Sequence, residues 1–130
     1  MVEFALVVVI VLLLLIGVSE FGRAWNICQV LSNAAREGAR LAALPTGFTT
    51  AAAVRSRIDG YLTNAGMDQS KATITIGGAG VDGGTGSQVS ILVTYPYQFL
   101  FMGPVIRLIK PSSTAGADVT LRAECVMRNE

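Results

Sequence analysis

The side chains that most enzymes and metal sites depend on are scarce in this sequence. It contains no histidine, which excludes the commonest general base, the usual Ser-His-Asp arrangement and most zinc sites. Its aspartates Asp59, Asp68 and Asp82 show no paired spacing for acid–base chemistry. We therefore expect no catalytic residue, no metal site and no cofactor, and predict that the protein is not an enzyme.

Two cysteines, Cys28 and Cys125, are the remaining reactive side chains. They form no CxxC pair and cannot supply a four-ligand metal site. Two alternatives are open. A disulfide would close a loop of roughly 100 residues and stabilise the fold by about 4 to 5 kcal/mol in an oxidising compartment. Otherwise the two side chains are inert thiols in the core.

A glycine-rich stretch matches the GxGxxG pattern at Gly78–Gly83 and follows a predicted strand. More glycine and then another strand come after it, so no helix N-terminus is available to hold a pyrophosphate. Six glycines fall between positions 77 and 86. This composition favours a hairpin loop between two strands over a nucleotide site.

A single acidic residue, Glu3, stands at the start of a wholly apolar run. Residues 4–18 read FALVVVIVLLLLIGV, without one polar side chain. A carboxylate beside such a run costs several kcal/mol in lipid unless it is paired. Glu3 either pairs with a cation from another subunit, most simply an α-amino group, or it reaches to the membrane interface.

The apolar run determines the elements that must position these residues. As a helix it is roughly 22 Å long, which is marginal for crossing a bilayer, and a cleaved signal peptide fits poorly because no basic residue precedes it. No proline occurs before Pro45, so one helix to about Leu44 is expected. Charges near Trp25 mark the end of the apolar half, a boundary rather than a site.

The second half of this helix becomes amphipathic and must pack outside the membrane. Small residues recur there at helical spacing, which allows another backbone to approach closely. The predicted helix-packing residues are Ala34, Ala35, Gly38, Ala39 and Ala42.

The remainder of the chain predicts a second helix and three strands. Thr49 or Thr50 can cap a helix that ends near Gly66. Its apolar stripe is expected to comprise Val54, Ile58, Tyr61 and Leu62. Strands are expected at 72–76, 88–97 and 118–128, where apolar residues alternate with polar ones. The fold class is therefore α+β, with both helices covering a small antiparallel sheet; residues 1–44 form a stem and 45–130 a globular head.

Several strings resemble the TadE family of Tad-type pilin-like proteins, within the type IV pilin superfamily. They are VEFALV, SEFGRAW and NAAREGARLAA in the N-terminal region, and TYPY and MRNE near the end. The resemblance implies a pilin-like fold and a subunit that a prepilin peptidase cleaves. The inner-membrane assembly machinery would then move it from the bilayer into an extracellular filament of itself, other pilins or both.

In this resemblance Glu3 takes the role of the family's acidic residue near the mature N-terminus, so intersubunit pairing is assigned to Met1, Glu3 and Phe4. Superfamily members usually carry that acid at the fifth mature position with an aromatic next, whereas here it is third. Either Met1 is not the mature start, or the pairing register differs. The missing leader implies a processed or truncated chain.

The sequence therefore predicts a structural subunit of a Tad-type pilus, polymerising through its N-terminal helix for surface attachment. The formal charge of +1 gives no electrostatic support for nucleic-acid binding. The alternative is a single-span membrane-anchored binding module that acts through an aromatic patch near residues 95–101.

Overall fold

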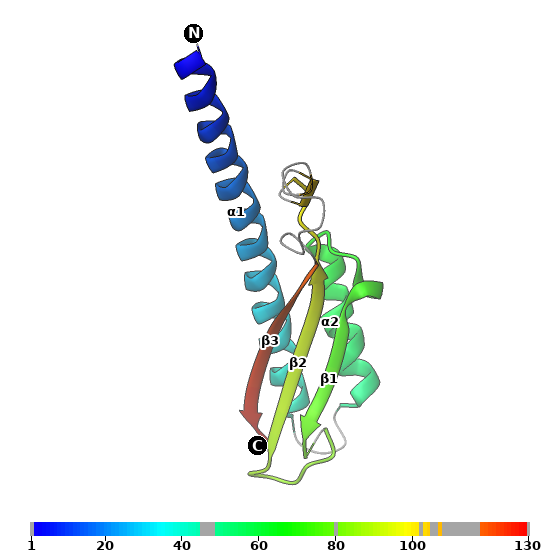
Figure 1. Cartoon of the computed structure of the whole chain (residues 1–130). Coiled ribbons are helices and arrows are strands. Elements are labelled where there is room, and N and C mark those ends of the chain that lie inside the picture. The colour runs from blue at the N-terminus through cyan, green and yellow to red at the C-terminus, as the bar shows by residue number, and fades with distance from the viewer. Residues whose placement is uncertain are drawn as a thin grey trace. The chain divides into compact units, whose positions relative to one another are not determined.

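A computed structural model describes residues 2–44, 49–79, 81–101, 103–104, 107 and 118–129. Its elements, in order, are α1 (Val2–Ala42), α2 (Ala51–Asn64), the short 3-10 helix η1 (Gln69–Lys71), β1 (Thr73–Gly78), β2 (Gln88–Tyr97) and β3 (Val119–Arg128) (Figure 1). The predicted α+β fold is confirmed, with a long N-terminal helix, a second helix and a three-stranded antiparallel sheet. Two compact units divide the chain: unit 1 is Met1–Ile27 with Tyr97–Val119, and unit 2 is Cys28–Pro96 with Thr120–Glu130.

Helix α1 contains 41 residues and runs without interruption from the apolar run into the amphipathic segment. Its last turn tightens where Ala43 N donates to Ala39 O at 2.9 Å and Leu44 N donates to Leu41 O at 3.3 Å. The predicted end near Leu44 is therefore correct to within two residues. Among the described residues, α1 is the one helix long and apolar enough to cross a membrane.

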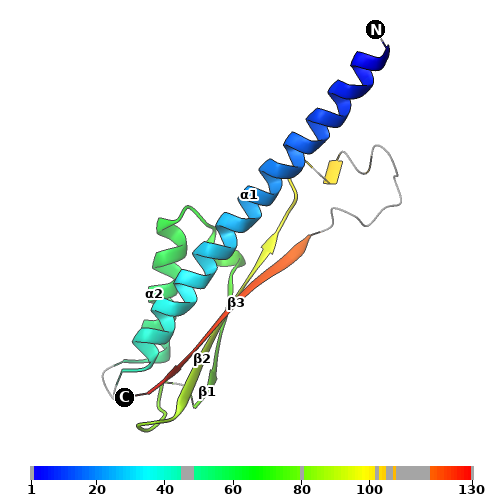
Figure 2. The same cartoon turned by 90° about the vertical axis from the view of Figure 1, so that its left-hand side faces the viewer.

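In unit 2, the second half of α1 and the whole of α2 lie on one side of the sheet (Figure 2). Their contact is close because the residues of α1 that face α2 are small. Ala34, Ala35, Ala39 and Ala42 are fully buried, and Gly38 is buried with them. A Cβ atom added to Gly38 would lie 2.5 Å from Cδ1 of Ile58 in α2 and 3.6 Å from Cγ2 of Ile91 in β2. Gly38 therefore lies where the two helices and the sheet meet.

Helix α2 begins and ends with the signals expected from the sequence. Thr50, one of the two predicted caps, accepts a hydrogen bond at Oγ1 from Ala53 N at 3.2 Å. After the helix, Gly66 takes a positive φ of 76°, which residues with side chains rarely adopt. Val54, Ile58 and Leu62 are fully buried. The prediction that Tyr61 belongs to this stripe is wrong, since Tyr61 is exposed.

The sheet has the strand order β1-β2-β3, so β2 is central. In the antiparallel pairing of β1 with β2, Ile74 faces Val93 and Ile76 faces Ile91. This pairing confirms that the glycine-rich segment connects the two strands of a hairpin. Along β3 the expected alternation is also present: Leu121, Ala123, Cys125 and Met127 are half-buried, and the residues between them are exposed.

The close approach at Gly38 predicts a stability change. Gly38→Val should lower the free energy of unfolding by about 1 to 3 kcal/mol, because its Cβ would lie 2.5 Å from Cδ1 of the fully buried Ile58. The same substitution at Gly60 in α2 is the matched control, since a Cβ there would meet nothing within 4 Å. Chemical denaturation followed by circular dichroism measures both, and equal effects would contradict the packing described.

Candidate assembly surface and a buried carboxylate

The N-terminal part of α1 exposes a large apolar surface. Every large apolar side chain from Val2 to Leu15 is exposed, as are Val18, Phe21 and Trp25. Burying one such side chain completely contributes about 1.5 to 3 kcal/mol. A surface of this size does not stay in water, so either lipid or protein must cover it.

The residues predicted to pair between subunits lie at the start of this surface. Glu3 is exposed, and none of the described residues forms a hydrogen bond or ion pair with it. Phe4 beside it is 75% exposed. Met1 lies outside the described residues. The pairing role of Met1, Glu3 and Phe4 stays a prediction.

A second acidic residue, Glu20 in unit 1, is buried. Only 2% of it is exposed, although it follows the apolar run by two residues and the sequence indicates no more than a boundary there. Tyr97 Oη donates to Oε2 of Glu20 at 2.6 Å, and Phe101 N donates to Oε1 at 2.7 Å. Each carboxylate oxygen therefore has a donor from the segment 97–101.

Arg23, one turn further along α1, holds the same segment. Its Nη2 lies 3.5 Å from Oε2 of Glu20 and donates to the carbonyl oxygen of Gln98 at 3.0 Å. Its Nε donates to Tyr97 Oη at 3.3 Å, and the guanidinium carbon lies 5.3 Å from the centroid of the Tyr97 ring. Glu20 and Arg23 together fasten residues 97–101 to the helix.

These contacts shift two pKa values. Burial by itself raises the pKa of Glu20, but the hydrogen bonds from Tyr97 and Phe101 and the charge of Arg23 outweigh it, so this pKa is lowered. Burial, and then the hydrogen bond to Glu20, raise the pKa of Tyr97. At neutral pH Glu20 is therefore an anion and Tyr97 a neutral donor, as the hydrogen bond requires.

The burial of Tyr97 also alters the aromatic patch predicted near residues 95–101. Only 3% of Tyr97 is exposed, and Tyr95 and Phe99 are half-buried. Leu100 and Phe101 are exposed. The aromatic residues of this segment are therefore partly used inside the fold, and its exposed apolar surface is mainly Leu100 and Phe101.

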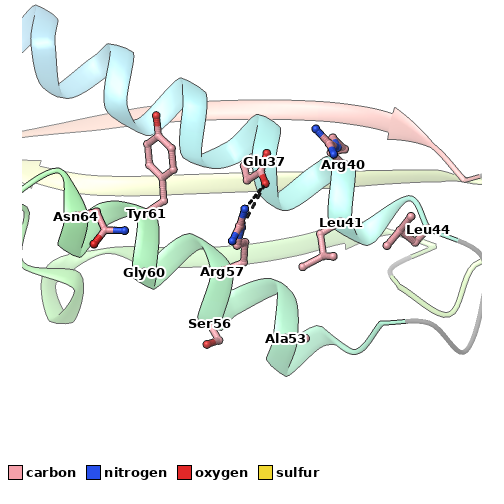
Figure 3. Close-up of a pocket in the computed structure, with 10 residues that line it drawn as sticks. All are labelled: Glu37, Arg40, Leu41, Leu44, Ala53, Ser56, Arg57, Gly60, Tyr61 and Asn64. Carbon is pink, nitrogen blue, oxygen red and sulfur yellow. Dashed lines mark hydrogen bonds and ion pairs between the residues drawn. The ribbon is translucent and has the colours of Figure 1, made fainter.

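Unit 2 contains a cavity of about 760 Å³ between the end of α1 and α2, lined by both polar and apolar residues (Figure 3). Arg57 of α2 donates to Oε1 of Glu37 through Nη2 at 2.9 Å and Nε at 3.2 Å. Arg40, Tyr61 and Asn64 also line the cavity. It brings together no pair of carboxylates. Within the described ranges, no three His, Cys, Asp or Glu residues are grouped to hold a metal ion.

Both cysteines belong to unit 2 and are half-buried free thiols. The possible disulfide between Cys28 and Cys125 stays a prediction.

A comparison with known protein families gives a match, and it falls on α1, the helix that carries the exposed apolar surface. Residues 1–40 match the family model described as TadE-like protein. The N-terminal helix is therefore similar to this family over about a third of the chain. This match confirms the resemblance over VEFALV, SEFGRAW and most of NAAREGARLAA, whereas TYPY and MRNE lie outside it. No curated protein and no solved structure gives a significant match. The TadE-like family is pilus-associated and structural, and together with the apolar helix it indicates a Tad pilus-associated protein.

The contacts of Glu20 predict the effect of removing one donor. Tyr97→Phe should lower the free energy of unfolding by about 1 to 3 kcal/mol, because it leaves one oxygen of a buried carboxylate without its hydroxyl donor. Tyr95→Phe is the matched control, because its hydroxyl forms no hydrogen bond within the described structure. That variant should differ from the unmodified chain by less than about 0.5 kcal/mol. If denaturant titrations give the same result for both, the contact does not hold the segment.

The lowered pKa of Glu20 predicts a dependence on acid. A carboxyl whose pKa is lower in the folded than in the unfolded chain stabilises the fold at pH values above its ordinary pKa of 4.5. This stabilisation is lost as the pH falls through the pKa that the carboxyl has in the folded chain. The melting temperature of the unmodified chain should therefore fall below pH 4.5 more steeply than that of Glu20→Gln. Parallel melting curves of the two proteins from pH 7 to pH 3 measure this, and identical slopes would argue against it.

Proposed function

We propose that this chain is a pilin, a structural subunit of a Tad-type filament that polymerises through α1 and serves surface attachment. The observation that carries the proposal is the exposed apolar surface of α1 within the TadE-like segment. Nothing in the described part of the chain covers this surface, and in this proposal neighbouring subunits cover it. No reaction is part of the proposal.

In this proposal the chain has two consecutive environments. Before assembly, the apolar run crosses the inner membrane as a single span, and prepilin peptidase acts on the leader. Assembly machinery in that membrane then extracts the subunit, and helices of neighbouring subunits replace lipid around the run. Residues 1–44 act as the stem in the filament core, and residues 45–130 act as the head on the cell surface.

The alternative function, a membrane-anchored binding module, depends on the aromatic patch near residues 95–101. Leu100 and Phe101 are available to a partner in that segment, but Tyr97 is committed to Glu20. The exposed area of α1 is much more extensive and lies in the part of the chain that matches the family. The pilin proposal is therefore the better supported of the two.

A substitution at Glu3 tests the assembly role. Glu3→Ala should strongly reduce filament yield while leaving the head folded, because the apolar run would lose the charge that pairs with a neighbouring subunit. Filaments are counted by electron microscopy, and folding is followed by circular dichroism. Glu124→Ala, which removes an exposed carboxylate on β3, serves as the control and should assemble normally. Normal yield from Glu3→Ala would refute the pairing role, and discrete particles from the unmodified chain would refute the pilin proposal.

A further inference from the structure

Among the described residues, nothing requires Gly22 of α1, in unit 1, to be glycine. Its backbone does not have a positive φ, which among the described glycines occurs at Gly66, Gly78 and Gly86. A Cβ atom added to Gly22 would meet nothing within 4 Å, whereas one added to Gly38 would collide with Ile58. Glycine weakens a helix relative to alanine, so its presence here needs another explanation.

The neighbours of Gly22 distinguish it from Gly60 of α2, another helical glycine with space around it. Val18, Phe21, Gly22 and Trp25 occupy positions i, i+3, i+4 and i+7, the four that border a hole on a helix surface in knobs-into-holes packing. We call these four residues the Gly22 hollow, because the glycine leaves one side of the hole without a side chain. Gly60, which also has free space, lies among polar residues of the cavity in unit 2.

The rim of the Gly22 hollow is apolar and exposed. Val18 is 63% exposed, Phe21 69% and Trp25 59%. The rings of Phe21 and Trp25 stack with centroids 6.1 Å apart, so the two large side chains lie side by side on the rim. Buried aromatic residues of this kind contribute much of the binding energy in protein interfaces.

Unit 1 covers a different side of α1 at the same level. Residues 97–101 are fastened there by Glu20 and Arg23, through the hydrogen bonds to Tyr97, Gln98 and Phe101. At 3.6 residues per turn, Glu20 points well away from the face that carries Val18 and Trp25. The contacts that the described residues of unit 1 make with α1 therefore leave the Gly22 hollow open.

We propose that the Gly22 hollow receives an apolar side chain from residues 4–18 of a second copy of this chain. This occupant is favoured because the large apolar side chains of that run from Phe4 to Leu15 are exposed and lie on all sides of the helix. The hydrocarbon tails of lipid are less favourable occupants, because the charged residues Glu20 and Arg23 lie in the same turns of α1 as the hollow. The inference rests on the proposed polymerisation through α1 and names its contact.

The proposed contact joins two different surfaces of the same chain. The knob comes from the apolar run, whereas Phe21, Gly22 and Trp25 of the hole lie beyond that run, so each copy offers one knob and one hole to different neighbours. A contact between unlike surfaces does not close on itself in a pair and continues in an open helical array unless the rotation forms a ring. The Gly22 hollow therefore fits a filament better than a closed dimer.

Trp25 provides a direct probe, since it is the one tryptophan of the sequence and forms part of the rim. The full chain is studied in detergent at a fixed detergent concentration while the protein concentration is raised. Self-association is measured by sedimentation, and access to Trp25 by acrylamide quenching of its fluorescence. Quenching should decrease as copies associate.

Three variants test the contact. Gly22→Leu fills the hollow and should weaken self-association by about tenfold, with Trp25 remaining accessible, as expected for loss of a central interface contact. Gly22→Ala fills it partly and should weaken association less, while its melting temperature stays the same or rises because alanine favours the helix. Gly60→Leu is the control at a glycine with equal free space outside the hollow, and should associate normally.

The outcomes separate this inference from the proposed function. The contact is overturned if Gly22→Leu associates as the unmodified chain does. It is also overturned if Trp25 is already protected from acrylamide in single copies, because detergent or lipid then covers the hollow. Normal filaments from Gly22→Leu in electron micrographs overturn the contact and leave the pilin proposal standing. Gly22-dependent association without any filaments of the unmodified chain supports the contact and refutes the pilin proposal. If the unmodified chain does not associate at any concentration, both are overturned.

Discussion

The apolar run of α1 is the constraint on which the other features depend, because no described part of the chain covers it. One uninterrupted helix carries this run and then, beyond Cys28, a set of small residues that form part of the core of unit 2. The same element therefore has two kinds of surface with different needs. The small residues pack against other residues of unit 2. The apolar run packs against none of the described residues, so lipid or protein has to cover it.

The two acidic residues of α1 near the apolar run show how this division works in detail. Glu20 is buried and receives hydrogen bonds at both oxygens from residues 97–101 of its own unit. Glu3 is exposed and has no partner among the described residues. A carboxylate that is already satisfied has little to offer another molecule, because breaking its contacts would leave a buried charge unpaired. Between these two, Glu3 is therefore the acid suited to an external cation.

The sequence predicts well whatever depends on local periodicity. The extent of α1, the cap at Thr50 and the hairpin around the glycine-rich loop follow from signals within a few residues. Tyr61 shows the limit of this approach, since it lies at the edge of an apolar stripe and burial there depends on what packs against it. The role of Glu20 is not encoded locally, because its donors Tyr97 and Phe101 lie 77 and 81 residues further along the chain.

Glycine has two different physical uses along α1. Gly38 is required by packing inside unit 2, where the side chain of Ile58 occupies the space that a Cβ would take. No described residue places such a demand on Gly22, and yet glycine weakens the helix there, beside two exposed aromatic rings. A residue that weakens the isolated subunit without serving its packing is best explained by a state in which something else occupies that space. A second copy of this chain would fill the space beside Gly22 and would also cover the exposed apolar run.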